Sequence, residues 1–447
     1  HGRPEEVAAV VGFLASEGSV GYVSAPAGVS GADLNGWTID GGWALPEDVD
    51  GDGSQDDHTA VYTGGRVDAF IGGGDIGGGL VAETGVGFAM TQRGDWAGDL
   101  IADSNAVGQL LVIDGDIDLE DGRRISSAST INSIQAINGD LLGDGEDGTR
   151  EITVENGSLW SLMAINGKID GISAEVRSSG GASWKGTIGT ILSTGSRDGI
   201  DRSCFDVDRR IDHVGVHGPW RRQGGRRGSI GDLDQTTFRA NALGSVSVSR
   251  TMRGTSFHLT GGSLQSLSVM RDIEDSTVSL RNGSGALSGR LDSVYVNGDT
   301  RDTAIEAGSL GNLYVRGWAE RSGFFTSGNM GSVTVGAARD TTCFAGVKVT
   351  HDWNGDGVLD LPDPATELNL TPGGRASIGS VRVTGLSGGG DWIINSNLAA
   401  AQMHFVHVID PRNDNDGVPF GVAADRIGTY LWVDGGSWEV YSNMDGP

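Results

Sequence analysis

The chain has 447 residues, and its 59 acidic residues against 32 basic ones give a formal net charge of −27. This negative charge argues against nucleic acid as a partner, because phosphate groups would be repelled. No run of about 18 apolar residues occurs, so no membrane-spanning helix and no membrane insertion are predicted. With 76 glycines and only 6% aromatic residues, the composition favours a narrow aliphatic core with many tight turns.

The first 33 residues are predicted to cap the rest of the chain. Residues 4–16 carry a proline and two glutamates ahead of a run rich in alanine and valine, which is typical of a short helix. Such a helix would cover the open edge of a first coil, or serve as an arm that docks on a neighbouring subunit. The chain begins at His1 with no basic and apolar leader, so we expect a mature exported chain or a fragment.

Residues 34–106 are predicted to form glycine-rich first coils that are interrupted by a calcium loop. The loop begins at Asp48, and Gly53 occupies its sixth position, where a calcium loop needs a sharp turn. Acidic side chains stand at its positions one, three, five and nine, and they are Asp48, Asp50, Asp52 and Asp56. Position twelve is Thr59 rather than the glutamate of an EF-hand. Asp57, a backbone carbonyl or a residue from elsewhere would then complete the oxygen ligands.

Between residues 107 and 440 a six-residue motif, called the phrase here, is repeated many times. It joins an aliphatic anchor, two small polar residues and an aliphatic alternation, as in 291–296, 310–315 and 330–335. The anchors are Val107, Ile131, Leu159, Ile188, Ile211, Leu243, Leu264, Leu291, Leu310, Met330, Ile378, Met403 and Ile427. One copy is too short to bury its own apolar face, so the copies must stack as parallel strands at about 4.8 Å.

The intervals between anchors indicate variable turns on a constant strand. They run from 19 residues (291 to 310) to 32 (211 to 243), where a further anchor at Ile230 would fit. One interval of 48 residues (330 to 378) contains a second acidic loop. We expect two strands and two turns in each coil of roughly 20 residues.

The second acidic loop, near residues 351–363, repeats the arrangement of the first. Its candidate calcium ligands are Asp352, Asn354, Asp356, Asp360 and Asp363. Residues 413–417 form a weaker third candidate. Without a metal, several carboxylates would crowd one turn and repel one another, so we expect a bound Ca²⁺ to fix each loop.

A basic patch interrupts the acidic chain. It comprises Arg221, Arg222, Arg226 and Arg227. The patch is either a solvated turn or a contact for an acidic partner, and the nearest acidic partner is another copy of this chain. Head-to-tail or lateral contacts of that kind do not close on themselves and would give filaments or sheets.

Residues four positions after each anchor are predicted to face outward. In this column Tyr295 and Tyr314 occupy the same position on adjacent coils, so their rings should stack. Such a ladder either supports itself or binds sugar. The column shows no carboxylate cluster beside a basic residue, which argues against a lyase-type enzyme.

Two other groups of residues leave alternatives open. Aromatic residues gather at the end of the chain, where they either plug the last coil or form an exposed contact patch: Tyr430, Trp432, Trp438 and Tyr441. Residues 441–447 are predicted to be a tail. Cys204 and Cys343 lie in similar phrases several coils apart, too far for a bridge within the chain, so each is a buried thiol or bonds to another molecule.

The repeated Leu-Gly-Ser-Val-x-Val phrase resembles the right-handed parallel β-helix proteins, which include pectate-lyase-like enzymes, adhesins and surface-layer or fibre proteins. The acidic loops resemble those of dockerin and thrombospondin type-three repeats. The resemblance implies an all-β solenoid with a short helical cap and inserted calcium loops. We expect a secreted structural subunit of an extracellular fibre, sheath or surface layer, or alternatively a protein that binds or degrades polysaccharide.

Overall fold

The structure is a computed structural model, and its strands stack in parallel. It describes residues 22–24, 59–63, 65–72, 75–145, 150–180, 182, 184–218, 221–223, 226–228, 231–347, 352, 357–362, 376–412, 421–434 and 437–445. Every regular element among these residues is a strand. The helix predicted over residues 4–16 lies outside them. The chain divides into two compact units, His1–Gly231 and Asp232–Pro447.

Unit 1 contains two parallel sheets, named A and B here, and one antiparallel hairpin. Sheet A is built from β1 (Tyr22–Ser24), β3 (Arg66–Val67), β4 (Ala69–Gly72), β6 (Gly85–Gln92), β8 (Val107–Ile113), β9 (Ile117–Asp118), β11 (Ile131–Ile137), β12 (Leu141–Leu142), β14 (Ser158–Asp170), β16 (Thr187–Asp201) and β18 (Arg210–His217). Sheet B is built from β2 (Thr59–Thr63), β5 (Gly79–Ala82), β7 (Leu100–Ala102), β10 (Ile125–Ser127), β13 (Ile152–Val154), β15 (Ser173–Val176) and β17 (Cys204–Val207). The hairpin pairs β19 (Arg221–Gln223) with β20 (Arg226–Gly228).

Unit 2 repeats the two-sheet plan and ends in a strand that runs the other way. Its sheet A strands are β21 (Leu233–Asp234), β23 (Ala242–Val248), β24 (Met252–Arg253), β26 (Leu264–Val269), β27 (Ile273–Glu274), β29 (Arg290–Val296), β30 (Thr300–Arg301), β32 (Ser309–Glu320), β34 (Met330–Arg339), β36 (Ser377–Val383), β37 (Ile393–Ile394), β39 (Gln402–Ile409), β41 (Arg426–Asp434) and β42 (Ser437–Asp445). Its sheet B strands are β22 (Thr237–Ala240), β25 (Ser256–Leu259), β28 (Thr277–Leu280), β31 (Ala304–Ala307), β33 (Gly323–Thr326), β35 (Thr342–Ala345), β38 (Asn397–Ala400) and β40 (Gly421–Ala423). Only β42 is antiparallel to its neighbour among these strands.

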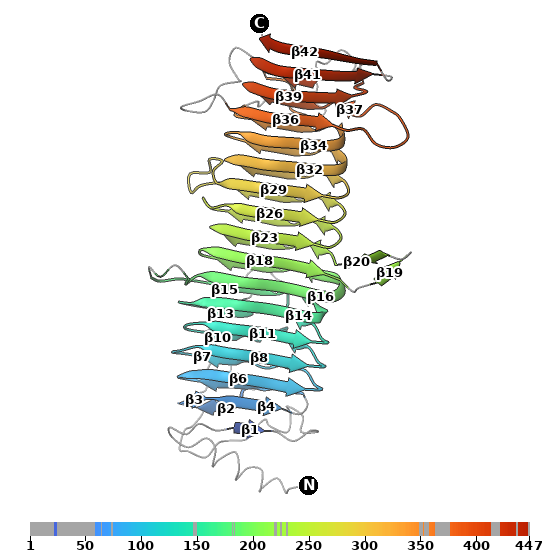
Figure 1. Cartoon of the computed structure of the whole chain (residues 1–447). Helices are drawn as coiled ribbons and strands as arrows, with labels where there is room; N and C mark the ends of the chain where they lie inside the picture. Colours follow the sequence, from blue (N-terminus) through green and yellow to red (C-terminus); the bar gives the residue numbers. More distant parts are fainter. Residues whose placement is uncertain are drawn as a thin grey trace, which may run out of the picture. The chain divides into compact units, whose positions relative to one another are not determined.

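The anchor columns predicted from the sequence are confirmed within each unit. In unit 1 the five predicted anchors pair coil by coil, from Val107 to Ile211. The same column extends back into the first coils predicted over residues 34–106, because Val67 pairs with Val86 and Val86 with Val107. In unit 2 the pairing runs without a break from Leu243 to Ile427. Figure 1 shows these strands laid one above another in each unit.

The long interval between Met330 and Ile378 is an insertion in one coil. These two anchors are direct partners in neighbouring strands, β34 and β36, so no hidden coil lies between them. The acidic loop predicted near residues 351–363 therefore falls within the segment that joins β35 to β36. Ile230, the further anchor considered for the other long interval, lies outside the described residues.

Each regular coil contains three straight segments where the sequence predicted two. After the anchor strand of sheet A, such as β26, a two-residue strand of the same sheet follows, β27, before the chain reaches sheet B at β28. A two-residue strand is too short to show an alternation of apolar and polar residues, so these strands were not predicted from the sequence. In β14, β16, β32 and β34 the two sheet A segments of a coil form one continuous strand.

The core is a narrow column of stacked side chains. The anchors are at most 7% exposed, and sheet B contributes a second column in which Phe238 and Phe257 stack with ring centroids 4.9 Å apart. Fully burying one such side chain stabilises a fold by roughly 1.5–3 kcal/mol, so each coil depends on the coils above and below it for most of its stability.

Candidate functional site

The first predicted calcium loop and the third candidate lie outside the described residues. This applies to Asp48, Asp50, Asp52 and Asp56, and to residues 413–420. In the second loop the structure describes Asp352 and Asp360, whereas Asn354, Asp356 and Asp363 lie outside. The ligand set predicted for calcium therefore stays a prediction.

The described part of the second loop turns sharply at its predicted glycine. Gly357 has φ of +84°, in the left-handed region that favours glycine. Its backbone N–H donates a hydrogen bond of 2.8 Å to Oδ2 of Asp352. Asp360 is only 4% exposed. Positions one and six of the loop are thus in contact, which is how a tight loop would gather its oxygen atoms on one side.

The four arginines of the basic patch come together on the β19–β20 hairpin. Arg222 pairs with Arg227 across the two strands, and Arg221 and Arg226 stand at the two ends of the paired segment. In Figure 1 the hairpin projects to the side of the stacked strands of unit 1. The structure therefore brings these residues to one short element that lies off the coils.

The outward column four residues after the anchors is confirmed. Tyr295 and Tyr314 are partners in β29 and β32, and their rings stack with centroids 5.2 Å apart and an interplanar angle of 5°. They are 39% and 37% exposed. Smaller residues flank the stack, Ser268 on one side and Thr334 on the other. One face of each ring is therefore left open.

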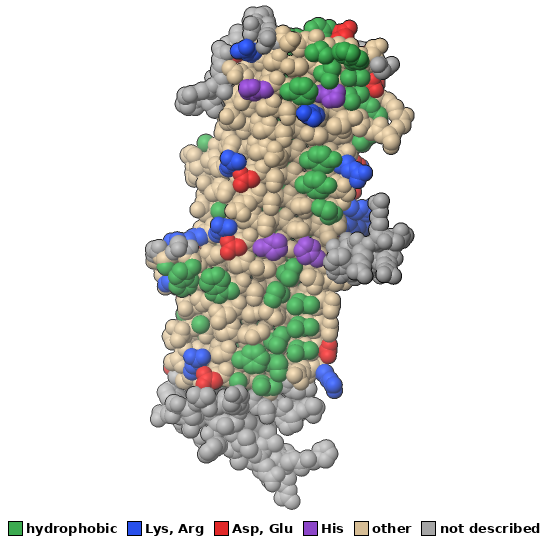
Figure 2. All heavy atoms as spheres, viewed as in Figure 1, with side chains coloured by type: hydrophobic (Ala, Val, Ile, Leu, Met, Phe, Trp, Pro, Cys, Tyr) green, Lys and Arg blue, Asp and Glu red, His purple; other side chains and the backbone are tan. Residues whose placement is uncertain are grey.

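The outer face of sheet A in unit 1 carries many apolar side chains, with Gln109 and Gln135 among them. Half-buried side chains alternate with core residues along β6, β8, β11, β14 and β16 and align from coil to coil: Phe88, Met90, Leu111, Ile113, Ile137, Met163, Ile165 and Leu192. Figure 2 shows hydrophobic side chains gathered over these strands. We call this set the apolar face.

The C-terminal strand β42 carries the most exposed aromatic side chain of the described residues. Trp438 is 70% exposed, Val440 52% and Tyr441 45%. Tyr430 on β41 is more enclosed, and burial raises its pKa. The predicted alternatives therefore divide between the two strands, because Tyr430 packs inward whereas Trp438 and Tyr441 are exposed, on opposite faces of β42.

The two cysteines differ in their surroundings. Cys343 belongs to the core column of sheet B, opposite Phe324, and burial raises the pKa of its thiol to about 12. Cys204 pairs with Ser173 and is half-buried, while the core position of its strand is taken by Phe205. The buried-thiol alternative holds for Cys343.

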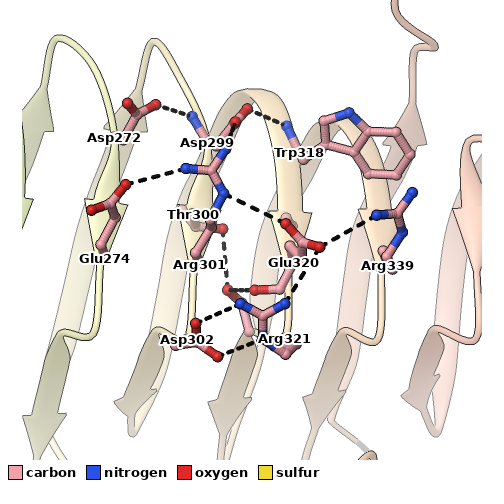
Figure 3. Close-up of polar contacts among 12 residues, drawn as sticks. Asp272, Glu274, Asp299, Thr300, Arg301, Asp302, Trp318, Glu320, Arg321 and Arg339 are labelled. Atoms are coloured by element: carbon pink, nitrogen blue, oxygen red, sulfur yellow. Dashed lines mark hydrogen bonds and ion pairs between the residues drawn. The ribbon is translucent and has the colours of Figure 1, made fainter.

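In unit 2 a column of alternately positive and negative side chains runs from coil to coil, just before the corner at which each coil turns from sheet A to sheet B. The sequence did not predict this column. Arg253 bonds to Glu274 at 3.0 Å, Glu274 to Arg301 at 3.1 Å, and Arg301 to Glu320 at 3.5 Å. The column continues in register at both ends, with Asp234 at 3.9 Å from Arg253 and Arg339 at 3.4 Å from Glu320. Figure 3 shows its central members side by side.

Each corner has the same local structure. One residue with positive φ is followed by a buried serine or threonine whose hydroxyl donates to the carbonyl oxygen two residues before it. The positive-φ residues are Gln235, Gly254, Asp275, Asp302, Arg321, Asp340 and Asn395. The hydroxyl residues are Thr236, Thr255, Ser276, Thr303, Ser322, Thr341 and Ser396. A sequence signal for them exists, since the corner residue stands eleven positions after Leu243, Leu264, Leu291 and Leu310.

The comparisons with known proteins give no relative. No family model, no curated protein and no solved structure matches this chain. Within the described ranges, no helix could span a membrane, and no three His, Cys, Asp or Glu side chains group as they would around a metal ion. The fold class that the structure itself defines is an all-β protein with long parallel sheets stacked in register, consistent with a parallel β-solenoid.

Proposed function

We propose that this protein is a secreted structural subunit that assembles with copies of itself into an extracellular fibre, sheath or surface layer. In this proposal the coils are right-handed, residues 1–33 include a helical cap, and Ca²⁺ holds the inserted loops. The observation that carries the proposal is β42, which pairs on one edge with β41 and bears exposed apolar side chains.

An unpaired strand edge is a template for another chain. No described strand pairs with the second edge of β42, and in this proposal the backbone N–H and C=O groups of that edge pair with another chain. Its exposed residues include Trp438, Val440 and Tyr441, which a partner would cover. A second copy is the partner that this proposal assigns to the edge of β42.

Two further features support lateral contacts between copies. The apolar face of unit 1 is a run of aligned side chains on the outside of a sheet, and such runs on soluble proteins mark contact surfaces. The basic hairpin β19–β20 belongs to a chain with a net charge of −27, so a second copy offers many carboxylates to it.

The assembly role of β42 is tested by a double substitution, Trp438→Ser with Val440→Lys. We expect the native protein to form polymers in the presence of Ca²⁺, and we expect the double variant to stay monomeric, because a lysine on an edge strand disfavours edge-to-edge pairing. The matched control is Trp184→Ser, since Trp184 is 46% exposed and lies in a turn outside β42.

Sedimentation velocity and electron microscopy of the three proteins decide the outcome. Polymers of the double variant at the same concentration as those of the native protein would contradict the role of β42. A native protein that stays monomeric over a range of Ca²⁺ and protein concentrations would contradict the structural function itself.

The second candidate function is binding or degradation of polysaccharide. The stacked rings of Tyr295 and Tyr314 favour binding, because each ring has one open face on a polar surface, where the C–H groups of a sugar could pack. Affinity electrophoresis in gels that contain neutral or acidic polysaccharide separates this candidate from the first, and release of reducing or unsaturated ends would indicate an enzyme.

A further inference from the structure

Two histidines on β18 lean toward one another over a glycine. The burial pattern of this strand points Ile211, Val214 and Val216 into the core, so His213, Gly215 and His217 alternate on the outer face. A Cβ atom added at Gly215 would lie 2.9 Å from Nε2 of His213 and 3.2 Å from Nε2 of His217. Both ring nitrogens therefore lie over the same point of the strand.

Gly215 differs in its surroundings from most other glycines of the coils. At Gly311 and Gly331 the closest atom to an added Cβ is a backbone carbonyl oxygen of the neighbouring coil, which explains why no side chain is present there. At Gly215 the three nearest atoms all belong to side chains, and two of them are the imidazole nitrogens. The glycine thus leaves the space into which the two imidazoles lean.

The space beside Gly215 lies next to apolar side chains of the same outward column. The preceding coils carry Met163 and Leu192 where β18 carries Gly215, and the methyl Cδ1 of Leu192 forms the floor, 2.8 Å from the added Cβ. On the coil below, Thr190 and Thr194 stand opposite the two histidines. The site is thus walled by imidazoles and floored by an apolar side chain.

The chemistry of the two side chains suits coordination, because an imidazole ring in its neutral form offers a nitrogen lone pair. Neutral imidazole is a ligand for zinc, copper and nickel, whereas calcium prefers oxygen, so the site differs in chemistry from the acidic loops.

We propose that His213 and His217 form a two-ligand site for a late first-row transition metal ion such as Zn²⁺, Ni²⁺ or Cu²⁺, with Gly215 leaving room for the ion. Metal-to-nitrogen bonds are about 2.0–2.1 Å long for zinc, so in this proposal the two rings turn further toward one another when the ion binds. Water completes the coordination, and the ion is exchangeable. This site does not depend on the proposed structural function.

The site is tested by calorimetric titration of the full chain with ZnCl₂ and with NiCl₂, in excess Ca²⁺ to occupy the acidic loops. We expect one ion to bind per chain at pH 7.5, and binding to weaken as the pH is lowered, since protons compete with a metal ion for imidazole nitrogen. We expect His213→Gln and His217→Gln each to weaken binding by more than about tenfold.

Two further variants separate coordination from a change in folding. Gly215→Ala keeps both imidazoles but places a methyl group between them, so it should also weaken binding, and its thermal melt shows whether the coil is intact. His404→Gln, on β39 in unit 2, should bind metal like the native chain. Unchanged binding by a folded His213→Gln/His217→Gln double variant, or no binding of either ion by the native chain, would overturn the proposal.

Discussion

Gly311 shows how single atoms set the stacking of neighbouring coils. It occupies the second position of the repeated phrase, directly above the carbonyl oxygen of Asp292 in the coil below. A Cβ atom there would lie far inside van der Waals contact with that backbone oxygen, which cannot rotate away as a side chain could. The glycine of the phrase is therefore a packing requirement at this coil.

We expect Gly311→Ala to lower the free energy of unfolding by roughly 1–3 kcal/mol, the usual cost of overpacking. Gly283→Ala is the matched control, because an added Cβ at Gly283 has no atom within 4 Å. That control should be neutral or slightly stabilising, since alanine restricts the unfolded chain. Urea titrations of the three proteins measure the difference, and equal effects of the two substitutions would refute this account of Gly311.

The cysteines show a limit of sequence reasoning at the residue scale. The phrases around Cys204 and Cys343 look alike, but Ser203 and Thr341 are the residues that share the corner position. The phrases are thus offset by one residue, and in a strand such an offset moves a side chain to the opposite face. Only the corner, which was not recognised in the sequence, fixes which thiol is buried.

At the scale of the element, residues at the corners also form ion pairs between neighbouring coils. Arg321 donates two hydrogen bonds of 2.7 Å to the two carboxylate oxygens of Asp302, from the same corner position of the next coil. These bonds lower the pKa of Asp302 below its ordinary value. In a group whose pKa is lower in the folded state, the stabilisation is present above the unfolded value, near 4, and is lost as the pH falls through the folded value.

We therefore expect Arg321→Gln to lower the melting temperature at pH 7, and we expect this effect to shrink as the pH falls toward about 2 and Asp302 becomes protonated. Glutamine fits this backbone, because Gln235 occupies the equivalent corner with φ of +42°. The double variant Asp302→Asn/Arg321→Gln should show a weaker pH dependence than the native chain. Thermal melts across this pH range measure the effect, and a pH-independent loss in Arg321→Gln would count against the pairing.

The strands of sheet A were predictable because their signal is repeated. An aliphatic residue such as Leu291 must return to the same inward column in each coil, and this requirement restricts the residue type to a few apolar ones. The corners were not predicted because their requirements are met by many residues. Positive φ is adopted there by aspartate, arginine, glutamine, asparagine and glycine, so residue identity varies while backbone structure is constant.

At the scale of the whole molecule, the acidic loops are predicted to couple stability to calcium. Gly357 and Asp352 already form the expected tight turn, and the carboxylates of one loop would repel one another without a cation. We expect removal of Ca²⁺ with a chelator to lower the melting temperature or to dissolve an assembly. Re-addition of Ca²⁺ should reverse the effect and Mg²⁺ should not, since Mg²⁺ demands a stricter octahedral geometry.

Differential scanning calorimetry before and after chelation measures the first effect, and light scattering measures the second. A variant with Asp352→Asn and Asp360→Asn should respond less to the chelator than the native chain. If neither the melting temperature nor the scattering changes on chelation, the calcium hypothesis fails. The second loop was predicted from the spacing of its acidic residues, whereas its place between two paired anchors needed the register of Met330 with Ile378.

The charge column of unit 2 also restricts how such a unit could be lengthened or shortened. Its signs alternate from one coil to the next, so removal of the single coil that carries Arg301 would set Glu274 against Glu320, two negative charges in adjacent positions. Removal of two consecutive coils would instead bring Glu274 beside Arg339 and preserve the attraction. The alternation of charge therefore tolerates the gain or loss of two coils together and disfavours the gain or loss of a single coil.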